Sequence, residues 1–336
     1  MSPTDSLDEP TRKPRWYRFT ADRLVVGLLL IECLLWMSER WQWFPFNAHK
    51  GWTVLIGLAG IGLGALVMLL WFIAAVLWGW RFQFSIRSLL LLTVTVAVPC
   101  SWLAVERKAA NKQREAVEEI RRCGGQVQYD YQYDVFPRFH PSAEPPEPPW
   151  LRNLLGDDFF SHVRFAILPG TQVTDAWLEH LKDLPQLLAL DLDGTQVTDA
   201  GLQHLKDLPR LWGLGLSGTQ VTDAGLERLK GLAQLQALEL HRTQVTDAGL
   251  EHLNGLTQLE DLRLDDTQVT DAGLEHLKRL TRLKLLYLIG TQVTDAGLEH
   301  LKGLTQLQSL FLDKIRVTNA GVNKLKQALP ECEIYR

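Results

Sequence analysis

The sequence has few cysteines, and their spacing argues against two common kinds of site. Only four cysteines occur in 336 residues, and no two of them form a C-x-x-C pair. Cys33 and Cys100 lie in apolar runs, whereas Cys123 and Cys332 lie far apart in the sequence. Neither a zinc site nor a disulfide framework is therefore expected.

Clustered positive charge is also missing. The formal net charge is -4, and no strongly basic run occurs. Proteins that bind nucleic acids usually carry a basic patch that complements the phosphate backbone, so we expect no nucleic-acid partner. No constellation of a nucleophile and a base stands out, so an enzyme is the least favoured class and we expect no cofactor.

A repeat of 24 residues is what the sequence does contain. The stretch 195–202 reads TQVTDAGL, and its copies begin at Thr171, Thr219, Thr243, Thr267 and Thr291, with a degenerate copy over 315–322. A fixed period of this length is typical of a solenoid of stacked units. In each unit, L-x-x-L-x-L predicts a short strand. The V-T-D-A-G-L stretch predicts a helix with threonine at its N-terminus and a favourable aspartate beside it.

The pattern L-x-x-L-x-L-x-x-T-x-V-T-D-A-G-L resembles the leucine-rich repeat family, in the subtype that carries V-T-D-A-G-L. The resemblance covers about residues 163–336 and implies a curved α/β solenoid, with a parallel sheet on the concave face and helices on the convex face. Trp177 replaces the usual glycine in the first copy, and Ile315 replaces threonine in the last. Some relatives are substrate-recognition subunits of eukaryotic ubiquitin ligases, but nothing before these repeats resembles an adaptor-binding segment.

An apolar region precedes the repeats and predicts membrane spans. Residues 51–80 carry no charge, and at ~1.5 Å per residue a helix of that length exceeds the ~30 Å hydrocarbon core. The expected spans cover about 24–43, 51–78 and 88–105, with the first the weakest because Glu32 interrupts it. Two or three spans therefore remain open. This layout resembles bacterial multi-pass membrane proteins with leucine-rich repeats.

The expected regions follow from these patterns. They are a polar basic tail over 1–21, a transmembrane region over 22–105, a helix–strand cap with a proline-rich loop over 106–162, and the solenoid over 163–336. Basic residues are slightly more numerous on the side of the N-terminal tail, which favours repeats on the non-cytoplasmic side of a multi-pass protein. No small-residue cleavage site follows the first apolar run, so a cleaved signal peptide is not expected.

Between the spans and the repeats, the pattern predicts a helix and a strand. Residues 106–122 place four apolar side chains on one helical face, and Gly124 and Gly125 end that helix. Residues 126–134 alternate apolar and polar side chains, as a strand does. We expect this pair to cover the first repeat. A short helix is expected over 150–160, and the first repeat strand over 163–168.

The outward strand positions are the candidate binding surface, because they differ from copy to copy. They include an acidic centre and an apolar patch near the C-terminus. The candidate partner-binding residues are Tyr287, Phe311, Leu285, Ile289, Arg263, Glu239, Asp191, Asp193, Asp261 and Asp265. Exposed aromatic side chains beside charge are typical of protein-binding surfaces. The favoured function is a membrane-anchored module that binds a protein or peptide, with a basic partner favoured by the acidic centre.

Alternative interpretations of the same residues remain. The spans could carry transport or signalling, with the repeats as a regulatory sensor. The stretch 188–195 fits the DxDGT motif of haloacid-dehalogenase-type phosphatases, but its aspartates occupy repeat positions. A row of histidines at one helical position (His180, His204, His252, His276 and His300) lies on neighbouring helices about 8–10 Å apart, too far to share a zinc ion. No metal is therefore expected.

Overall fold

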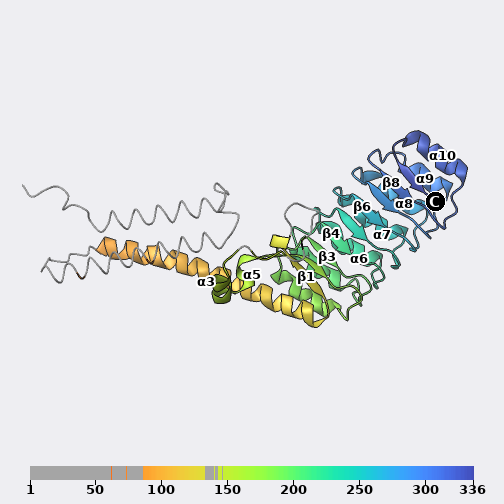
Figure 1. The fold of residues 1–336 in the computed structure, drawn as a ribbon. Helices are drawn as coiled ribbons and strands as arrows, with labels where there is room; N and C mark the ends of the chain where they lie inside the picture. Colours follow the sequence, from red (N-terminus) through yellow and green to blue (C-terminus); the bar gives the residue numbers. More distant parts are fainter. Residues whose placement is uncertain (1–61, 63–72, 74–85, 133–139, 141–142, 146) are drawn as a thin grey trace, which may run out of the picture. The chain divides into compact units, whose positions relative to one another are not determined.

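The structure is a computed structural model, and it describes residues 62, 73, 86–132, 140, 143–145 and 147–336 (Figure 1). The chain divides into two compact units. One comprises Met1–Lys108 and Pro146–Leu155, and the other comprises Ala109–Pro145 and Gly156–Arg336. The second unit holds all the repeats, and its sheet carries the side chains proposed above for binding.

Nine strands form a single sheet in which the order in space is the order in sequence. β1 pairs with β2 in the antiparallel direction, and every later pair is parallel. The strands are β1 (Gln126–Tyr129), β2 (Val163–Ile167), β3 (Ala189–Asp191), β4 (Gly213–Gly215), β5 (Ala237–Glu239), β6 (Asp261–Arg263), β7 (Leu285–Tyr287), β8 (Ser309–Phe311) and β9 (Glu333–Tyr335). This architecture is a leucine-rich-repeat solenoid.

Alternation along each strand separates the core from the surface, as the pattern predicts. In β5, Leu238 is fully buried, whereas its neighbours Ala237 and Glu239 are only half-buried. From β2 onward, neighbouring strands pair with an offset of 24 residues, so Leu238 pairs with Leu214 on one side and Leu262 on the other. The leucines therefore stack into one continuous apolar core along the solenoid.

In five repeats, the threonine that follows the strand is buried. Thr195 is 4% exposed, and its Oγ1 donates a hydrogen bond of 2.7 Å to the carbonyl of Leu192. The same bond recurs in the following repeats. A buried hydroxyl must be hydrogen-bonded to avoid a desolvation cost, and here the strand's own carbonyl meets that need.

Short helices line the other side of the sheet (Figure 1). They are η4 (Asp175–Asp183), η5 (Gly201–Asp207), α6 (Asp223–Arg228), η6 (Leu229–Gly231), α7 (Asp247–Glu251), η7 (His252–Gly255), α8 (Asp271–His276), η8 (Leu277–Arg279), α9 (Asp295–Leu301) and α10 (Asn319–Ala328). Each repeat has a helix where one was expected, and in the first two repeats, η4 and η5, it is a 3₁₀ helix. In η4, Thr174 makes no capping hydrogen bond, whereas Thr222 accepts one from the Ala224 N–H at the start of α6.

The aspartate that recurs in each repeat has a second role besides the expected one. Asp223, for example, lies in the first turn of α6 as expected, and its carboxylate also accepts hydrogen bonds from the next repeat. Asp199 Oδ1 accepts from the Thr222 backbone N–H at 2.8 Å, and Oδ2 accepts from the Thr222 hydroxyl at 2.7 Å. Six such pairs, which we call the Asp–Thr ladder, join Asp175–Thr198, Asp199–Thr222, Asp223–Thr246, Asp247–Thr270, Asp271–Thr294 and Asp295–Thr318.

The ladder also explains the glycine of the motif and its one replacement. A Cβ at Gly249 would clash with Asp223 Oδ1 of the preceding repeat, and the same holds at Gly225 against Asp199. The first repeat has no preceding repeat to supply an aspartate. Trp177 can therefore occupy the glycine position there, where it is largely buried.

A helix and a strand cover the N-terminal edge of the sheet. α3 (Ile86–Arg122) runs through the residues expected to form the third span and the following helix, so those two predicted elements are one helix. Ala116, Val117 and Ile120 pack into the repeat core. Gln113 Nε2 donates to the Ser161 carbonyl at 2.7 Å, which joins this helix to the entry of β2.

Two other predicted elements differ from the structure. The strand expected over 126–134 ends at Tyr129 and continues as η3 (Asp130–Gln132), because β2 begins at Val163 and offers no further ladder partner. The helix expected over 150–160 is two short helices, α4 (Pro149–Leu155) and α5 (Asp157–Phe160). Gly156 separates them with φ of 89°, a left-handed conformation that interrupts a helix.

The predicted membrane spans lie mostly beyond the described residues. The spans at about 24–43 and 51–78 fall outside them, apart from isolated positions, and most side chains of 88–105 are also not described. Within the described residues, no helix is both long and apolar enough to cross a bilayer. Membrane anchoring therefore stays a prediction from the sequence.

Candidate functional site

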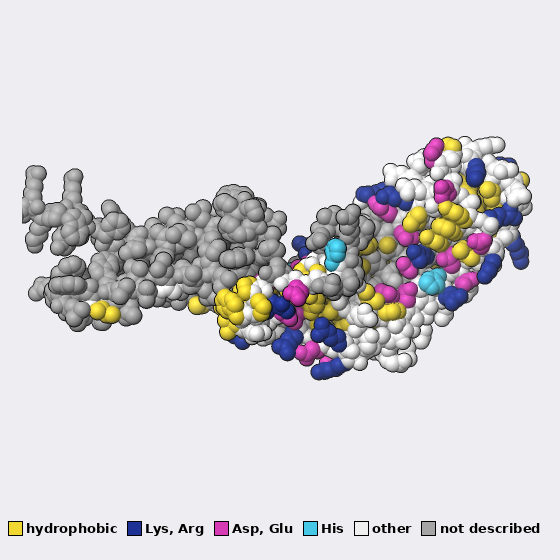
Figure 2. Space-filling model, viewed as in Figure 1, with side chains coloured by type: hydrophobic (Ala, Val, Ile, Leu, Met, Phe, Trp, Pro, Cys, Tyr) yellow, Lys and Arg dark blue, Asp and Glu magenta, His cyan; other side chains and the backbone are white. Residues whose placement is uncertain are grey.

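We call the side of the sheet that points away from the short helices the sheet face; it is the face expected to be concave. Its side chains fall into columns, because the parallel strands are in register every 24 residues. The central column contains Ile167, Asp191, Gly215, Glu239, Arg263, Tyr287, Phe311 and Tyr335. Figure 2 shows hydrophobic side chains gathered over the C-terminal part of the solenoid, beside a group of acidic and basic side chains.

Three aromatic rings at the C-terminal end of this column form a stack, which we call the aromatic row. The rings of Tyr287 and Phe311 lie 4.2 Å apart between centroids, with planes 5° apart. Phe311 and Tyr335 follow at 4.7 Å and 8°. This agrees with the strand spacing of ~4.8 Å, which places side chains of one column directly side by side. The row thus holds its rings in a fixed orientation, with little rotamer freedom left to lose on binding.

Leu285 and Ile289 flank Tyr287, on β7 and just beyond it. They are half-buried, as are Tyr287 and Phe311, so the patch is less exposed than the sequence suggested. The reason is that these side chains cover one another. Tyr335 is the most open member at 44% exposed. The patch therefore presents a firm apolar surface rather than freely mobile side chains.

Arg263 connects the aromatic row to the acidic part of the sheet face. Its guanidinium carbon lies 4.7 Å from the centroid of the Tyr287 ring, within the range of a cation–π interaction. The same guanidinium lies 3.8 Å from Glu239 Oε2 and 3.9 Å from Asp261 Oδ1. Its Nε and Asp261 Oδ1 are buried but make no hydrogen bond among the described residues. Arg263 thus extends the stack and partly neutralises its acidic neighbours.

Five carboxylates occupy the middle of the sheet face, and we call them the acidic group: Asp191, Asp193, Glu239, Asp261 and Asp265. Burial raises the pKa of Asp193, Glu239, Asp261 and Asp265 above the usual values, because desolvation disfavours the charged form. Backbone N–H groups oppose this at two positions, where Ser217 donates to Asp193 Oδ1 at 2.7 Å and Ile289 donates to Asp265 Oδ1 at 2.8 Å. A cation on this surface would stabilise the ionised forms.

The structure adds two features that the sequence reading missed. Tyr335 belongs to the aromatic row, and the 24-residue period counted on from Phe311 leads directly to it. Arg263 was expected on the surface, but its contact with Tyr287 follows only from the register of β6 and β7. Tyr335 thus enlarges the apolar end of the sheet face, and Arg263 borders it with a positive charge.

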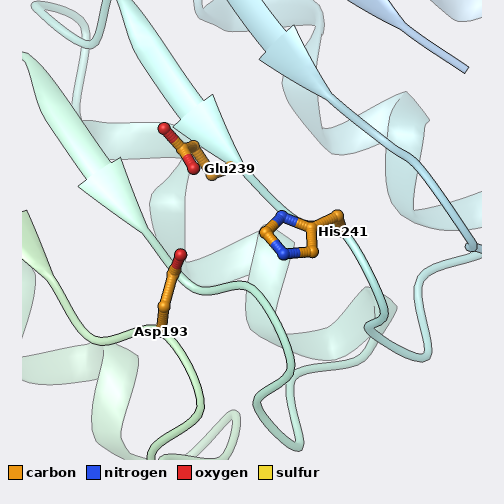
Figure 3. Close-up of side chains that lie close together, drawn as sticks. All are labelled: Asp193, Glu239 and His241. Carbon is orange, nitrogen blue, oxygen red and sulfur yellow. The ribbon is translucent and has the colours of Figure 1, made fainter. Parts of the chain in front are cut away.

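The other motifs keep the roles expected from the repeats. Asp191 and Asp193 of the DxDGT stretch lie on the sheet face, where Asp191 Oδ1 accepts the Asp193 N–H at 3.0 Å. The histidine row lies on the opposite side, within the short helices η4, η5, η7, α8 and α9. Among the described residues, the one group of three potential metal ligands that converge is Asp193, Glu239 and His241 (Figure 3).

Comparisons with known proteins give a limited result. An internalin C2 from Listeria monocytogenes matches with 29% identity and a TM-score of 0.43, over 51% of this chain and 70% of that one. A second internalin from the same organism matches with 23% identity and a TM-score of 0.38, and the alignment spans 49% of this chain and about half (51%) of that one. No family model and no curated protein matches. The fold class therefore rests on the repeats and strands of the chain itself.

Proposed function

We propose that this protein is a leucine-rich-repeat interaction module that binds a protein or peptide on its sheet face. The observation that carries the proposal is the aromatic row, which stands beside the acidic group on one continuous surface. The core positions of the repeats are nearly identical from copy to copy, whereas the outward positions are not. The constant positions build the solenoid, and the variable positions on its surface can be specific for one partner.

The aromatic row would supply most of the affinity. Aromatic side chains in well-packed surroundings are frequent hot spots, since they bury a large area and lose little conformational freedom. Leu285 and Ile289 lie beside Tyr287 and would exclude water from its edge. The acidic group would contribute differently, by attracting a basic partner and speeding its association.

Membrane anchoring is the second part of the proposal. It is supported by the uncharged run over 51–80 and by the two further apolar runs at about 24–43 and 88–105. Alkaline carbonate extraction of membranes from cells that express the full chain would test it. An integral protein stays in the pellet, and release into the supernatant would contradict anchoring without affecting the binding proposal.

The binding proposal can be tested with a defined probe. A random peptide library displayed on phage would be selected on the immobilised full-length chain, with Tyr287→Ala/Phe311→Ala as the counter-selection. We expect peptides that combine apolar or aromatic residues with lysine or arginine, and that bind the wild type better than the double variant. Selected peptides that bind both proteins equally would contradict a role for the aromatic row.

A further inference from the structure

The third repeat leaves a gap in the sheet face. Its three outward positions on and after β4 are Gly213, Gly215 and Ser217, the smallest set of any repeat. Two aspartate side chains of the second repeat occupy the space above Gly215. A Cβ at Gly215 would lie 2.9 Å from Asp193 Oδ1 and 3.3 Å from Asp191 Oδ1. Residues of the second and fourth repeats can therefore meet across a strand that would otherwise separate them.

Three different donor groups converge over this gap. Asp193 follows β3, Glu239 ends β5, and His241 lies two residues beyond it. One ligand atom from each of the three lies within 4.8 Å of the other two, and all three residues are half-buried (Figure 3). Asp193 and His241 also occupy the same column two repeats apart, with Ser217 between them.

The surroundings hold Asp193 in position for a ligand. Its Oδ1 accepts the Ser217 backbone N–H at 2.7 Å, which fixes the carboxylate and leaves Oδ2 available. A hydrogen bond of this kind to a coordinating carboxylate is typical of metal centres. The Ser217 side chain is 2% exposed, and its Oγ, although close to Asp193, makes no hydrogen bond of ordinary geometry within the described residues. Ser217 Oγ therefore lies beside the Asp193 carboxylate without a hydrogen bond of ordinary geometry, and a water molecule or an ion bound there would offer it a partner.

We propose that Asp193, Glu239 and His241 bind a divalent transition-metal ion of the Zn²⁺ type. An imidazole nitrogen with two carboxylate oxygens suits Zn²⁺, whereas Mg²⁺ and Ca²⁺ prefer oxygen ligands alone. With Zn–ligand distances of about 2.1 Å, tetrahedral ligands stand roughly 3.4 Å apart, so ligand atoms that now lie within 4.8 Å of one another must approach by up to about 1.4 Å. Three protein ligands leave a fourth position open to the sheet face, where water or a donor group of a partner can bind.

A metal ion at this site would also reduce the repulsion between the carboxylates of the acidic group. Burial raises the pKa of both carboxyl groups, and repulsion adds to it, from Asp191 at Asp193 and from Asp193 at Glu239. Arg263 lies 3.8 Å from Glu239 Oε2 and opposes the shift there. A bound divalent ion would offset that repulsion at the point where three acidic side chains face the gap. No soft thiolate lies in the donor set, which disfavours Cu⁺.

The test is a titration of the metal-free full-length chain with Zn²⁺, Mn²⁺ and Mg²⁺, followed by calorimetry and by competition with a chromogenic chelator. We expect one saturable Zn²⁺ site, weaker Mn²⁺ binding and no Mg²⁺ binding. Asp193→Asn, Glu239→Gln and His241→Ala should each weaken Zn²⁺ at least tenfold. Asp313→Asn removes the same charge in the same column as Asp193, and His252→Ala removes a histidine from the helix side; both controls should bind as the wild type does.

A second measurement separates loss of the site from loss of the fold. Zn²⁺ should raise the melting temperature of the wild type and not that of the three ligand variants, while all four proteins melt alike in EDTA. Gly215→Ala tests the gap itself, because the added Cβ crowds Asp193 Oδ1 and should weaken Zn²⁺ several-fold. The proposal is overturned if the wild type shows no saturable binding, or if binding survives His241→Ala and Asp193→Asn but is lost in His252→Ala.

Discussion

The two sides of this solenoid obey different constraints. On the helix side, the Asp–Thr ladder repeats with hydrogen bonds of 2.6–2.7 Å from each threonine hydroxyl to an aspartate. Each aspartate is followed two positions later by a glycine or, in the first copy, by tryptophan. On the sheet face, the central column changes from glycine to glutamate to arginine to tyrosine within four repeats. The contacts that join the units are therefore the same along the solenoid, whereas the side chains proposed for binding occur in only some of the units.

The largest loss of stability is expected for a substitution in the core beneath the sheet. Leu238→Ala removes a fully buried side chain and should lower the free energy of unfolding by about 2–5 kcal/mol, because a cavity remains. Its outward neighbour Glu239 is half-buried and held by no short hydrogen bond in the described structure, so Glu239→Ala should cost under ~0.5 kcal/mol. Urea denaturation of the full-length chain in EDTA, which removes any bound metal ion, would compare them. Equal losses would contradict the division between core and surface.

The ladder is predicted to be nearly as sensitive to a single methyl group. Gly249→Ala places a Cβ against Asp223 Oδ1, so the carboxylate must leave Thr246, whose N–H and hydroxyl it accepts at 2.8 and 2.6 Å. We expect a loss of about 2–3 kcal/mol from crowding and broken hydrogen bonds.

Gly231 provides the matched control for this change. It also lies on the helix side, but a Cβ there would meet no atom within 4 Å. Gly231→Ala should be neutral or stabilise by up to about 1 kcal/mol, because it restricts the unfolded chain. Thermal melts would compare the melting temperatures of the two variants. Equal melting temperatures would show that the ladder does not require glycine.

The sheet face should respond in binding rather than in stability. Tyr287→Ala removes the ring between Arg263 and Phe311, and we expect faster dissociation of a selected peptide by about 30-fold, equivalent to ~2 kcal/mol. Asp191→Asn should mainly slow association and reduce its salt dependence. Surface plasmon resonance at several salt concentrations separates the two. If both variants changed only the dissociation rate, or only the association rate, the aromatic row and the acidic group would not have the separate roles proposed.

The smallest effect is expected at the edge of the sheet face. Glu260 accepts hydrogen bonds from Lys284 at 2.6 Å and Arg282 at 2.8 Å, and the Lys284 hydrogen bond is the main reason that its pKa is lowered. Because the folded-state pKa is the lower one, the stabilisation is present above the unfolded value of about 4.3 and is lost as pH falls through the folded value.

Glu260→Gln should therefore lower the free energy of unfolding by about 0.5 kcal/mol at pH 7 and by less at pH 3. Urea melts at both pH values measure the difference. Glu227→Gln breaks a looser, more exposed ion pair of 3.7 Å and should change little at either pH. A larger loss at pH 3 than at pH 7 would contradict the direction of the pKa shift at Glu260.

Much of the fold follows from the repeat, because its period determines which residues share a column. The positions of Leu238, Tyr287 and Phe311 could be placed from the sequence alone. The ladder could not, since an aspartate at this place already suits the start of its own helix, and nothing local indicates that Asp199 also accepts hydrogen bonds from Thr222. The approach of Asp193 to Glu239 and His241 depends on small residues in the intervening repeat, which a reading of one copy at a time overlooks.

The central claim is that the sheet face, and its aromatic row in particular, is the binding surface. The most direct test measures the dissociation rate of a library-selected peptide from three full-length proteins: wild type, Tyr287→Ala/Phe311→Ala and His252→Ala/His276→Ala. We predict dissociation at least 30-fold faster from the aromatic variant and an unchanged rate from the histidine variant, which alters the helix side. A peptide that leaves the aromatic variant at the wild-type rate, but is lost from the histidine variant, would place the binding site on the helix side and contradict the claim.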